Sequence, residues 1–494
     1  MPDRRKRNAM PTDAQPAPTG ALPPPERRIF CNRTLNLRSI RAIGYDMDYT
    51  LIHYRVEKWE QRSFSTMRRK LREAGWPVGE LRFAPRDFQR GLIIDLELGN
   101  ILKANQFGYV KRAAHGTRML DFEPLRQAYA ETVVDLSEPR FVFLNTLFSL
   151  SEASMYAQLV DLVEAGQAPA PVGYADLYRL VKRVLDEAHL EGKLKAEIVA
   201  KPEAFVDLDP EVPWTLLDQK RAGKHLLLIT NSEWPFTQAM MRYAFDRYLP
   251  ADMTWRDLFD LIIVAARKPA FFLGQQPFFE VVDEQGLLTP VVGPPRAGGI
   301  FHGGHAGAVE QIFGLRGAQF LYVGDHAYGD VHVSKNLRRW RTALVARELE
   351  AEIRAEKAFT PRQRELTALM ARKVEMEREL SLLRLRVLHR KEGIAPPREA
   401  SLKELEAQLA AKREELLALD AAITPLAQAV GELGNRRWGL LMASGNDRSY
   451  FARQVERHAD IYTSRVSNLI YESPYAFFRA HRSVMPHERS LNGG

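Results

Sequence analysis

Two aspartates stand one residue apart in the stretch AIGYDMDYTLIHY, residues 42–54. The apolar residues before them are typical of a buried strand, so Asp46 and Asp48 would follow where that strand ends. A carboxylate in such a place is held by rigid backbone and still faces a solvent-filled crevice, which suits a group that reacts. Most isolated pairs of this kind lie in ordinary polar turns, so only further residues can show whether this pair belongs to a reactive site.

Three further apolar runs end in groups suited to a phosphate ester. Thr230, Asn231 and Ser232 close KHLLLITNS and offer hydroxyl, amide and backbone donors to phosphate oxygens. Lys268 closes LIIVAARK and can neutralise phosphate charge, and Asp325 in QFLYVGDH can give a hard cation a second carboxylate. Each group alone could be a helix cap, a solvated lysine or a turn. Their order on successive runs indicates one site for phosphate and a cation.

These groups need a scaffold that brings distant strand ends together. Apolar runs without alternation recur, separated by stretches of helical apolar spacing such as residues 237–249. The runs are residues 41–48, 224–232, 261–268, 319–326 and 342–346. Such a pattern indicates a parallel sheet covered on both faces, in which ligands bind beyond the carboxyl ends of the strands. We therefore predict an α/β fold with a Rossmann-like, doubly wound parallel sheet.

Length and composition limit the class of protein. A chain of 494 residues with 45% hydrophobic residues exceeds one compact core, so two domains or a large insertion are expected. No apolar stretch approaches the roughly 20 residues of a membrane helix, and the N-terminus lacks the apolar segment of a secretory signal. A single cysteine, Cys31, excludes an internal disulfide and suits a reducing compartment. We expect a cytoplasmic protein without membrane contact, in which Cys31 is inert.

The net charge of +8 would be compatible with nucleic acid or another polyanion as a partner. Residues 1–28, a basic and proline-rich stretch, hold six basic and three acidic residues, and we expect them to form a disordered tail. The remaining positive excess is mild for this length and also suits an enzyme that binds anionic, phosphorylated substrates. An ordinary solvated surface explains it equally well, so nucleic acid is not the expected partner.

The order of DMDYT, ITNS, a lysine and GDHAYGD resembles the haloacid dehalogenase superfamily of phosphohydrolases. More narrowly, the chain resembles the cytosolic purine 5'-nucleotidase family, through GYDMDYTL, FLNTLF at 143–148, YVGDHAYGD and the segment from FARQVERHAD to VMPHE. The resemblance covers most of residues 29–346 and 435–488. It implies a haloacid dehalogenase-like core. The implied core consists of residues 29–55 and 220–347, with the segment 423–494 returning to it.

A phosphate monoester is an anion, so an attacking carboxylate needs a divalent cation and a lysine beside it. The resemblance implies that Asp46 attacks phosphorus and forms an aspartyl-phosphate. Asp48 would protonate the leaving ribose oxygen and then deprotonate the hydrolytic water. Mg²⁺ would lie between the Asp46 side chain, the Asp48 backbone carbonyl, Asp325 and the phosphate. Asp330 would position the lysine. The residues implied to hold the phosphate oxygens are Thr230, Asn231, Ser232 and Lys268.

About 180 residues separate the first two motifs, far more than a loop, so residues 56–219 should form a cap over the crevice. Within it, VKRVLDEAHLEGKLK at 181–195 resembles the family's nucleoside-contacting segment. The substrate-binding residues that the resemblance implies are Phe148, for base stacking, and Lys182, Asp186, His189 and Lys195. A purine nucleoside monophosphate such as IMP or GMP is the expected substrate.

Three positions in this region depart from the family. Lys182 stands where the family has arginine, Leu190 where it has tyrosine, and Ser149 where it often has asparagine. These departures leave the base preference open. The segment also fits an amphipathic cap helix, and both interpretations can hold because the polar residues lie on other faces. The helix would be packed by Val181, Val184, Leu185 and Ala188.

The sequence HGGH contains His302 and His305, which suggest a metal site. Two histidines make a poor site, and no other ligand candidates stand at recognisable spacing. In the family this glycine pair lies in a turn before the helix that leads to the fourth motif. We expect a structural role for the glycines and no metal at the histidines.

Residues 348–422 are rich in Glu, Lys, Arg, Leu and Ala and predict a helical hairpin insertion. Met376, Leu380, Leu383 and Val387 follow a 4-3-4 spacing, and KEGIAPPRE at 391–399 should separate the arms. The arms could simply bury each other. They could also form an oligomer contact, because related nucleotidases assemble near this insertion, and we expect a homo-oligomer.

The resemblance also implies an effector site near the fourth motif, so activation by a purine nucleotide is an open expectation. Its matching residues are Asn145, Tyr328, Gln454 and Arg457. The sequence thus predicts a Mg²⁺-dependent 5'-nucleotidase for nucleoside monophosphates, with phosphotransfer to a second nucleoside as a related activity. Two alternatives stay open: a phosphatase for another small phosphomonoester, since the motifs do not specify the leaving group, and a non-catalytic protein that binds a partner or RNA through the hairpin and tail.

Overall fold

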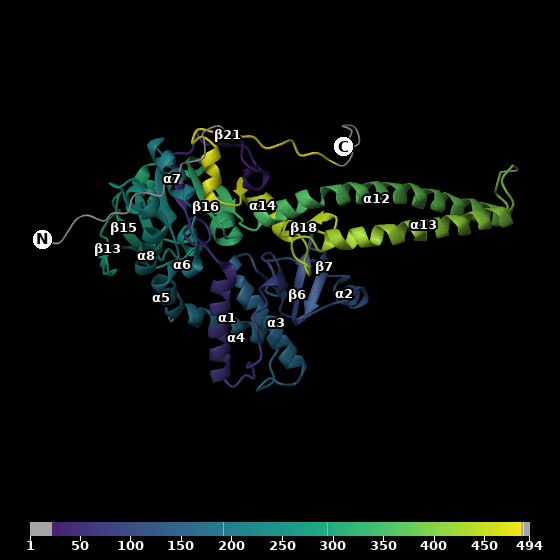
Figure 1. The fold of residues 1–494 in the computed structure, drawn as a ribbon, viewed down its shortest axis with the longest axis horizontal. Helices are drawn as coiled ribbons and strands as arrows, with labels where there is room; N and C mark the ends of the chain where they lie inside the picture. The colour runs from purple at the N-terminus through teal and green to yellow at the C-terminus, as the bar shows by residue number, and fades with distance from the viewer. Residues whose placement is uncertain (1–21, 191, 294, 397, 486–487, 489–494) are drawn as a thin grey trace. The chain divides into compact units, whose positions relative to one another are not determined.

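The computed structural model describes residues 22–190, 192–293, 295–396, 398–485 and 488. These residues form two compact units (Figure 1). One unit contains the chain up to Glu350 and from Leu441 onward, and the second contains Ala351–Leu440. Among the described helices, none combines the length and the apolar character that a membrane crossing demands.

In the described part of the chain, the first unit is built on a ten-stranded sheet in the order β1-β20-β17-β16-β3-β11-β12-β15-β13-β14. Neighbouring strands from β20 to β15 run parallel, whereas β1, β13 and β14 are antiparallel additions at the edges. The strands are β1 (Phe30–Cys31), β3 (Ala42–Tyr45), β11 (His225–Ile229), β12 (Leu261–Val264), β13 (Phe278–Val281), β14 (Leu288–Pro290), β15 (Ile300–Gly303), β16 (Phe320–Gly324), β17 (Arg341–Val345) and β20 (Ile461–Thr463). The predicted parallel sheet is confirmed, and each of the five apolar runs overlaps one of its strands.

Helices cover both faces of this sheet, which explains why its strands lack alternation. On one face, Ile43, Tyr45 and Leu228 pack in a cluster with residues of α7 (Glu211–Arg221) and α8 (Trp234–Phe245). On the other face, Leu227 and Tyr322 pack with residues of three helices. These helices are α9 (Ala270–Leu273), α10 (Ala306–Phe313) and α11 (Val333–Arg338). The doubly wound α/β class predicted from the sequence is therefore confirmed.

The register of the central strands determines which residues meet at the carboxyl edge. β3 lies between β11 and β16, and Tyr45 pairs with Leu228 on one side and with Val323 on the other. Because these strands are parallel, the residues that follow them emerge together. This edge therefore carries Asp46, the segment from Thr230 and the segment from Asp325.

A long segment is inserted after β3. The chain leaves the core at β4 (His53–Tyr54) and returns at β10 (Val206–Asp207), and these two strands pair antiparallel. The segment between them contains an antiparallel sheet in the order β8-β7-β6-β5-β9 and several helices (Figure 1). Its strands are β5 (Ile93–Asp95), β6 (Asn100–Ala104), β7 (Val110–His115), β8 (Arg118–Met119) and β9 (Phe141–Phe143). Its helices are α1 (Val56–Glu73), α2 (Phe122–Tyr129), α3 (Leu150–Glu164), α4 (Tyr174–Leu190), α5 (Lys193–Ala200) and α6 (Pro202–Phe205).

The last residues assigned to the cap from the sequence, those of α7, pack in the core. Leu216 and Leu217 of this helix belong to the same buried cluster as Tyr45 and Leu228. Because β10 pairs with β4, where the chain leaves the core, and α7 follows β10, the insertion proper ends at β10. We refer to residues 55–205 as the insertion.

Residues 22–28, which the composition assigned to a disordered tail, have a defined structure. Pro25–Arg27 form a 3-10 turn, and the Arg27 guanidinium donates to Ser467 at 3.0 Å and to Asn468 at 2.7 Å. Hydrogen bonds from a charged guanidinium are strong, so Arg27 holds this segment against the residues that it contacts. The rest of that stretch, residues 1–21, lies outside the described residues.

Other short elements complete the first unit. The C-terminal segment supplies α14 (Tyr450–His458), and β20 brings it back to the sheet beside β17. Small strand pairs join β2 (Leu35–Asn36) to β21 (Phe477–Phe478) and β18 (Ala443–Ser444) to β19 (Asp447–Arg448). A π-helical turn, Ala327–His332, follows β16.

The second unit is a helical hairpin made by α12 (Leu349–Lys391), which begins in the first unit, and α13 (Leu402–Gly431). The arms separate within KEGIAPPRE, and Ser401 caps α13 by accepting from the backbone N–H of Glu404. The buried seam includes the residues Met376, Leu380, Val387 and Leu405. Lys373 also pairs with Asp420 of the other arm at 2.6 Å. The second arm extends nine residues beyond the predicted end at 422.

Candidate active site

Asp46, Lys268 and Asp330 form a buried charged chain at the carboxyl edge of the sheet. The Lys268 Nζ atom lies 2.7 Å from Asp46 Oδ1 and 2.8 Å from Asp330 Oδ1, and its side chain is only 4% exposed. Lys268 also donates to the Tyr322 hydroxyl at 3.1 Å. One ammonium and two carboxylates have a net negative charge, so this group attracts an anion only when another cation is also bound. The lysine therefore orients Asp46, and its three N–H donors are directed at Asp46, Asp330 and Tyr322.

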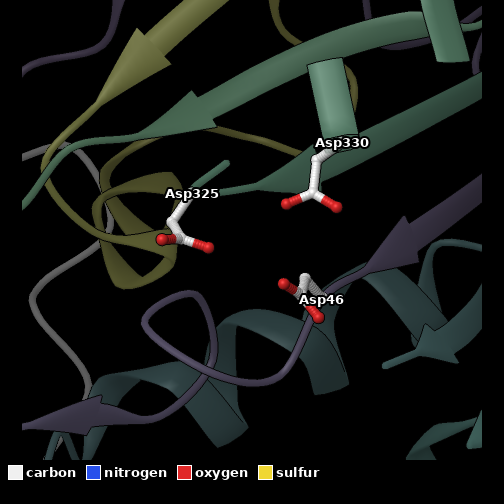
Figure 2. A group of neighbouring side chains, drawn as sticks. All are labelled: Asp46, Asp325 and Asp330. Atoms are coloured by element: carbon white, nitrogen blue, oxygen red, sulfur yellow. The ribbon is translucent and has the colours of Figure 1, made fainter. Parts of the chain in front are cut away.

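Asp46, Asp325 and Asp330 point toward one another (Figure 2). One carboxylate oxygen from each lies within 4.8 Å of the others, and all three residues are buried. Asp330 has both oxygens engaged, since Oδ1 meets Lys268 and Oδ2 accepts from the His326 backbone N–H at 3.1 Å. Among the described residues, Asp325 Oδ2 is buried without a hydrogen-bond partner. The free acceptors that could hold a cation therefore belong to Asp46 and Asp325.

The ionisation of these carboxyls reflects their crowding. Burial raises the pKa of Asp46 to about 7, with Lys268 opposing the shift and Asp330 and Asp48 adding to it. Burial, Asp330 and Asp46 raise the pKa of Asp325 well above its usual value. Burial alone would lower the pKa of Lys268, but Asp330 and Asp46 outweigh burial and raise it. A divalent cation would relieve this repulsion and keep both Asp46 and Asp325 ionised. The donor set is hard oxygen only, which fits Mg²⁺.

The segment after β11 forms a tight turn beside these carboxylates. Thr230 is buried, and its Oγ1 accepts from the Ser232 backbone N–H at 3.0 Å. The Asn231 amide is engaged by the backbone of Lys268, from which Oδ1 accepts at 2.7 Å and to which Nδ2 donates at 3.2 Å. Asn231 therefore fixes the lysine-bearing segment against the turn that carries Thr230 and Ser232.

Asp48 is held at both carboxylate oxygens. The Tyr54 hydroxyl donates to Oδ1 at 2.6 Å, and the Ser232 hydroxyl donates to Oδ2 at 2.6 Å. Lys195 of the insertion donates to Ser232 at 3.3 Å and lies over the Phe236 ring. The structure thus brings Lys195, Ser232 and Asp48 together, far apart as they are in the chain.

The other residues expected at the nucleoside lie in different surroundings. Phe148 is partly buried, with its ring centre 4.6 Å from that of Tyr49 and 5.3 Å from that of Trp59. Lys182 and Asp186 are exposed on α4 and pair with each other at 3.6 Å. The side chain of His189 lies outside the described residues. The apolar residues of this helix are buried as the amphipathic interpretation expects, namely Val181, Val184, Leu185 and Ala188.

A cavity of about 300 Å³ lies between the insertion and the segment that follows β16. Asn145 and Gln454, two of the expected effector residues, line it together with Phe143, Ala327 and His332. Arg457 is exposed one turn further along α14, and the side chain of Tyr328 lies outside the described residues. Among the described residues that line this cavity, none is one of the three clustered aspartates.

The two histidines of HGGH have structural surroundings. His305 Nδ1 accepts from the Ala308 backbone N–H at 3.3 Å and so caps α10, and the His302 ring packs near the Phe279 ring. Within the described ranges, the three aspartates are the only group of His, Cys, Asp or Glu side chains arranged to hold a metal ion.

Two residues of the site carry no motif in the sequence. Tyr54 lies at the end of the opening stretch, but a tyrosine after an apolar run indicates only a strand. Arg90 is 1% exposed and donates to the Asp325 backbone carbonyl at 2.9 Å and to Glu348 at 2.8 Å. Its partners are more than 230 positions away in the chain, so no local spacing signals them.

A doubly wound sheet whose carboxyl edge joins a lysine, two paired aspartates and a hydroxyl-rich turn defines an enzyme of phosphate-ester chemistry. The model of the 5' nucleotidase family matches residues 29–490. The chain therefore belongs to the 5' nucleotidase family and is an enzyme acting on phosphate monoesters. The family expected from the sequence is confirmed.

Individual relatives are distant. A 5'-nucleotidase domain-containing protein of Dictyostelium discoideum is 26% identical over 473 residues, covering 94% of this chain and 75% of that protein. The human 5'-nucleotidase domain-containing protein 2 is 26% identical over 484 residues, covering 94% and 85%. Among solved structures, an archaeal β-phosphoglucomutase from Pyrococcus is similar with a TM-score of 0.29 and 13% identity, covering 62% of this chain and 86% of its own. The fold class rests on the sheet itself.

Proposed function

We propose that this protein is a cytoplasmic, Mg²⁺-dependent 5'-nucleotidase that hydrolyses purine nucleoside 5'-monophosphates, IMP or GMP first, through an aspartyl-phosphate. The observation that carries the proposal is the contact of Asp46 with Lys268, beside the unpartnered oxygen of Asp325. This contact supports the proposal because it would supply a nucleophilic carboxylate, a cationic group and an acceptor for a cation close together. Family membership supports a phosphate monoester as the substrate.

The proposed reaction has two steps. In the first, an Asp46 oxygen forms a bond to phosphorus while the bond to the ribose oxygen breaks, and Asp48 gives its proton to that oxygen. In the second, water attacks phosphorus, its proton goes to Asp48, and the bond from Asp46 to phosphorus breaks. Asp48 thus regains the proton it gave up, and inorganic phosphate leaves.

The remaining groups bind and orient. Thr230, Ser232 and Lys268 would meet the phosphate oxygens, with Asn231 and Asp330 holding Lys268 in place. The side chains of Asp46 and Asp325 and the backbone carbonyl of Asp48 would hold Mg²⁺. When bound, the cation would neutralise the charge that builds up between carboxylate and phosphate.

The insertion supplies the groups that would contact the nucleoside. Lys195 already reaches Ser232, and Phe148 lies beside Tyr49, next to Asp48 in the chain. Phe148 would stack on the base. A nucleoside hydroxyl in place of water would accept the phosphoryl group, so phosphotransfer is part of the proposal.

We extend the proposal to regulation and assembly. A purine nucleotide activator would bind the cavity lined by Asn145 and Gln454, where an aromatic ring and amide groups could meet a base. Gln454→Ala should then remove activation and leave the basal rate unchanged. The hairpin would contribute to a homo-oligomer, which light scattering of the full chain and of a chain lacking residues 351–440 would test.

A second candidate is a phosphatase for another small phosphomonoester. The exposed pair of Lys182 and Asp186 favours this second candidate. These two side chains, which were expected to contact the nucleoside, contact each other instead. A screen of IMP, GMP, AMP, pyrimidine monophosphates and sugar phosphates, each with Mg²⁺ and with chelator, separates the two. Preferred hydrolysis of a sugar phosphate would contradict the nucleotidase. Asp46→Asn must abolish whichever activity appears, and a surviving rate would contradict the aspartyl-phosphate.

A further inference from the structure

Tyr54 connects the insertion to the acid–base residue. It is the last residue of β4, the strand by which the chain enters the insertion, and its hydroxyl donates to Asp48 Oδ1 at 2.6 Å. Burial and the neighbouring Asp48 raise the pKa of Tyr54 well above its usual value, so the phenol keeps its proton and acts as the donor. The hydrogen bond therefore has one defined direction.

The Tyr54 ring has little freedom to turn away. It is 3% exposed and packs with its centre 4.6 Å from the Trp59 ring and 5.5 Å from the Tyr49 ring. Close packing of this kind restricts a side chain to one rotamer. The hydroxyl is consequently a fixed point against which the Asp48 carboxyl is oriented.

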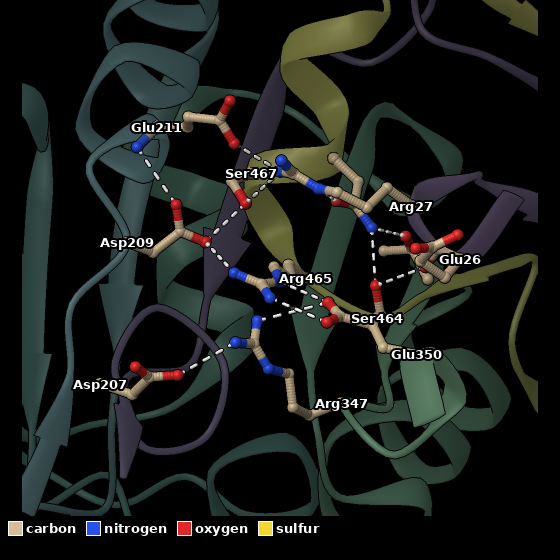
Figure 3. A network of polar contacts seen from close by, with 12 residues as sticks. Glu26, Arg27, Asp207, Asp209, Glu211, Arg347, Glu350, Ser464, Arg465 and Ser467 are labelled. Atoms are coloured by element: carbon tan, nitrogen blue, oxygen red, sulfur yellow. Dashed lines mark hydrogen bonds and ion pairs between the residues drawn. The ribbon is translucent and has the colours of Figure 1, made fainter. Parts of the chain in front are cut away.

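The strand pair that carries Tyr54 is itself anchored to the core (Figure 3). Across the pair, His53 lies opposite Asp207, and Arg347 donates to Asp207 at 3.0 Å. Two residues further on, Asp209 accepts from the Ser467 hydroxyl at 2.6 Å. The chain segments that meet here are the two strands that flank the insertion and the segments that follow β17 and β20. Tyr54 thus extends from a rigid frame.

We infer that Tyr54 is a positioning residue for Asp48, which it orients so that the carboxyl proton passes to the leaving ester oxygen. The inference rests on the proposed function. Tyr54 neither touches the substrate nor loses its own proton. In the first step the proton leaves the Asp48 carboxyl for the ester oxygen as the bond from phosphorus to that oxygen breaks. Ser232 holds the second Asp48 oxygen, so the two hydroxyls together set the plane of the carboxyl.

This role makes a specific demand on the leaving group. An alkoxide such as a ribose oxygen is a strong base and must be protonated as it departs, whereas p-nitrophenolate departs without a proton. An error in the orientation of Asp48 therefore slows hydrolysis of an alkyl phosphate and spares that of p-nitrophenyl phosphate. A merely structural defect slows both equally.

The test compares Tyr54→Phe with wild-type on two substrates, the alkyl phosphate that the wild-type chain hydrolyses fastest and p-nitrophenyl phosphate. Tyr54→Phe keeps the ring and removes the hydrogen bond to Asp48, so we expect the ratio of kcat/KM for the alkyl ester to that for the nitrophenyl ester to fall about tenfold or more. The loss should lie in kcat. Because both rates come from the same preparation, the ratio is independent of the fraction of folded protein.

Tyr49→Phe is the matched control. Tyr49 belongs to the same aromatic cluster, and among the described residues its hydroxyl is buried without a hydrogen-bond partner. Its removal should leave the ratio unchanged. An unchanged ratio in Tyr54→Phe would overturn the inference while the proposed function stands. A wild-type chain inactive on every phosphate ester would instead overturn the proposed function.

Discussion

The guanidinium of Arg90 donates a hydrogen bond of 2.9 Å to the backbone carbonyl of Asp325. Arg90 belongs to the insertion, whereas Asp325 directly follows β16 of the core. The same guanidinium donates to Glu348 at 2.8 Å and lies over the Phe451 ring. A residue of the insertion thus fixes the backbone of a proposed metal ligand.

Replacing Arg90 by methionine should weaken both metal binding and the fold. Partners that orient a metal ligand typically contribute tenfold to hundredfold in metal affinity, so we expect the Mg²⁺ affinity to fall about tenfold. Glu348 would lose its charged partner, so the free energy of unfolding should fall by about 3 kcal/mol. Isothermal titration with Mg²⁺ and urea unfolding measure the two effects. Arg62→Met, which removes an exposed pair with Glu197, should change neither.

Lys268→Met should abolish most of the activity. The ammonium lies between Asp46 and Asp330, so its loss leaves two buried carboxylates facing each other and removes the positive charge beside the proposed phosphate site. We expect kcat to fall about a hundredfold or more, the size typical of losing one electrostatic contact to the transition state. Steady-state kinetics on the best substrate tests this. Lys220→Met, which removes a partly exposed pair with Asp260, serves as the control; comparable losses in both variants would contradict a special role for Lys268.

Asp325→Asn should have opposite effects on stability with and without metal. Without metal, burial and the nearby Asp330 and Asp46 disfavour a charged Asp325, as the raised pKa of Asp325 indicates, so the neutral amide should melt at a higher temperature than wild-type. At a Mg²⁺ concentration about 100 times Kd, a bound ion stabilises wild-type by about 2.7 kcal/mol, and the variant should gain less. Differential scanning fluorimetry follows both. An equal Mg²⁺ response would remove Asp325 from the metal site, and Asp186→Asn should behave as wild-type throughout.

The buried Glu60 should make the insertion less stable as pH rises. Burial raises the pKa of Glu60 to about 8, while Ser151 hydrogen bonds oppose the shift. The folded state therefore holds a proton that the unfolded state releases near the ordinary pKa of 4.5. Its contribution to stability is fully present below pH 4.5, declines as pH rises, and is lost above about 8.

Glu60→Gln should remove this dependence. The slope of unfolding free energy against pH should become less negative between pH 5 and 8, by at most about 1.4 kcal/mol per pH unit. Urea unfolding at several pH values measures the difference between variant and wild-type. Parallel curves would show that Glu60 is ionised in the folded protein. Glu57→Gln, one turn earlier on α1 and exposed, provides the baseline.

Much of the core could be predicted because its signals are local. Strands buried on both faces have unalternated apolar sequences. Charged residues such as Asp46 and Lys268 follow several of these strands, and ordinary solvated turns would not require that combination of residue types. The hairpin could also be predicted, from the spacing of Met376 and Leu380 and from the helix-breaking residues before Ser401. The predicted second arm ends too early because the alanine-rich and leucine-rich composition continues past residue 422 without a signal that marks the end of the helix.

The rest depends on contacts between residues distant in the chain. Tyr54 and Arg90 act through partners that no spacing connects to them, and a tyrosine or arginine alone is compatible with many roles. Asn231 fits a phosphate ligand by type, yet its amide is engaged by the Lys268 backbone. Lys182 and Asp186 match a motif by position, but the helix exposes both to solvent. Side-chain type could indicate these residues; only the fold shows where each one is directed.

The adjacency of β4 and β10 also has an evolutionary consequence. Both crossings between core and insertion occur at one two-stranded ribbon, so a different insertion could be grafted there without rerouting the central sheet. Recognition of the leaving group can then diversify by exchange of the insertion, while Asp46, Lys268 and Asp330 keep their places beyond the carboxyl ends of the strands.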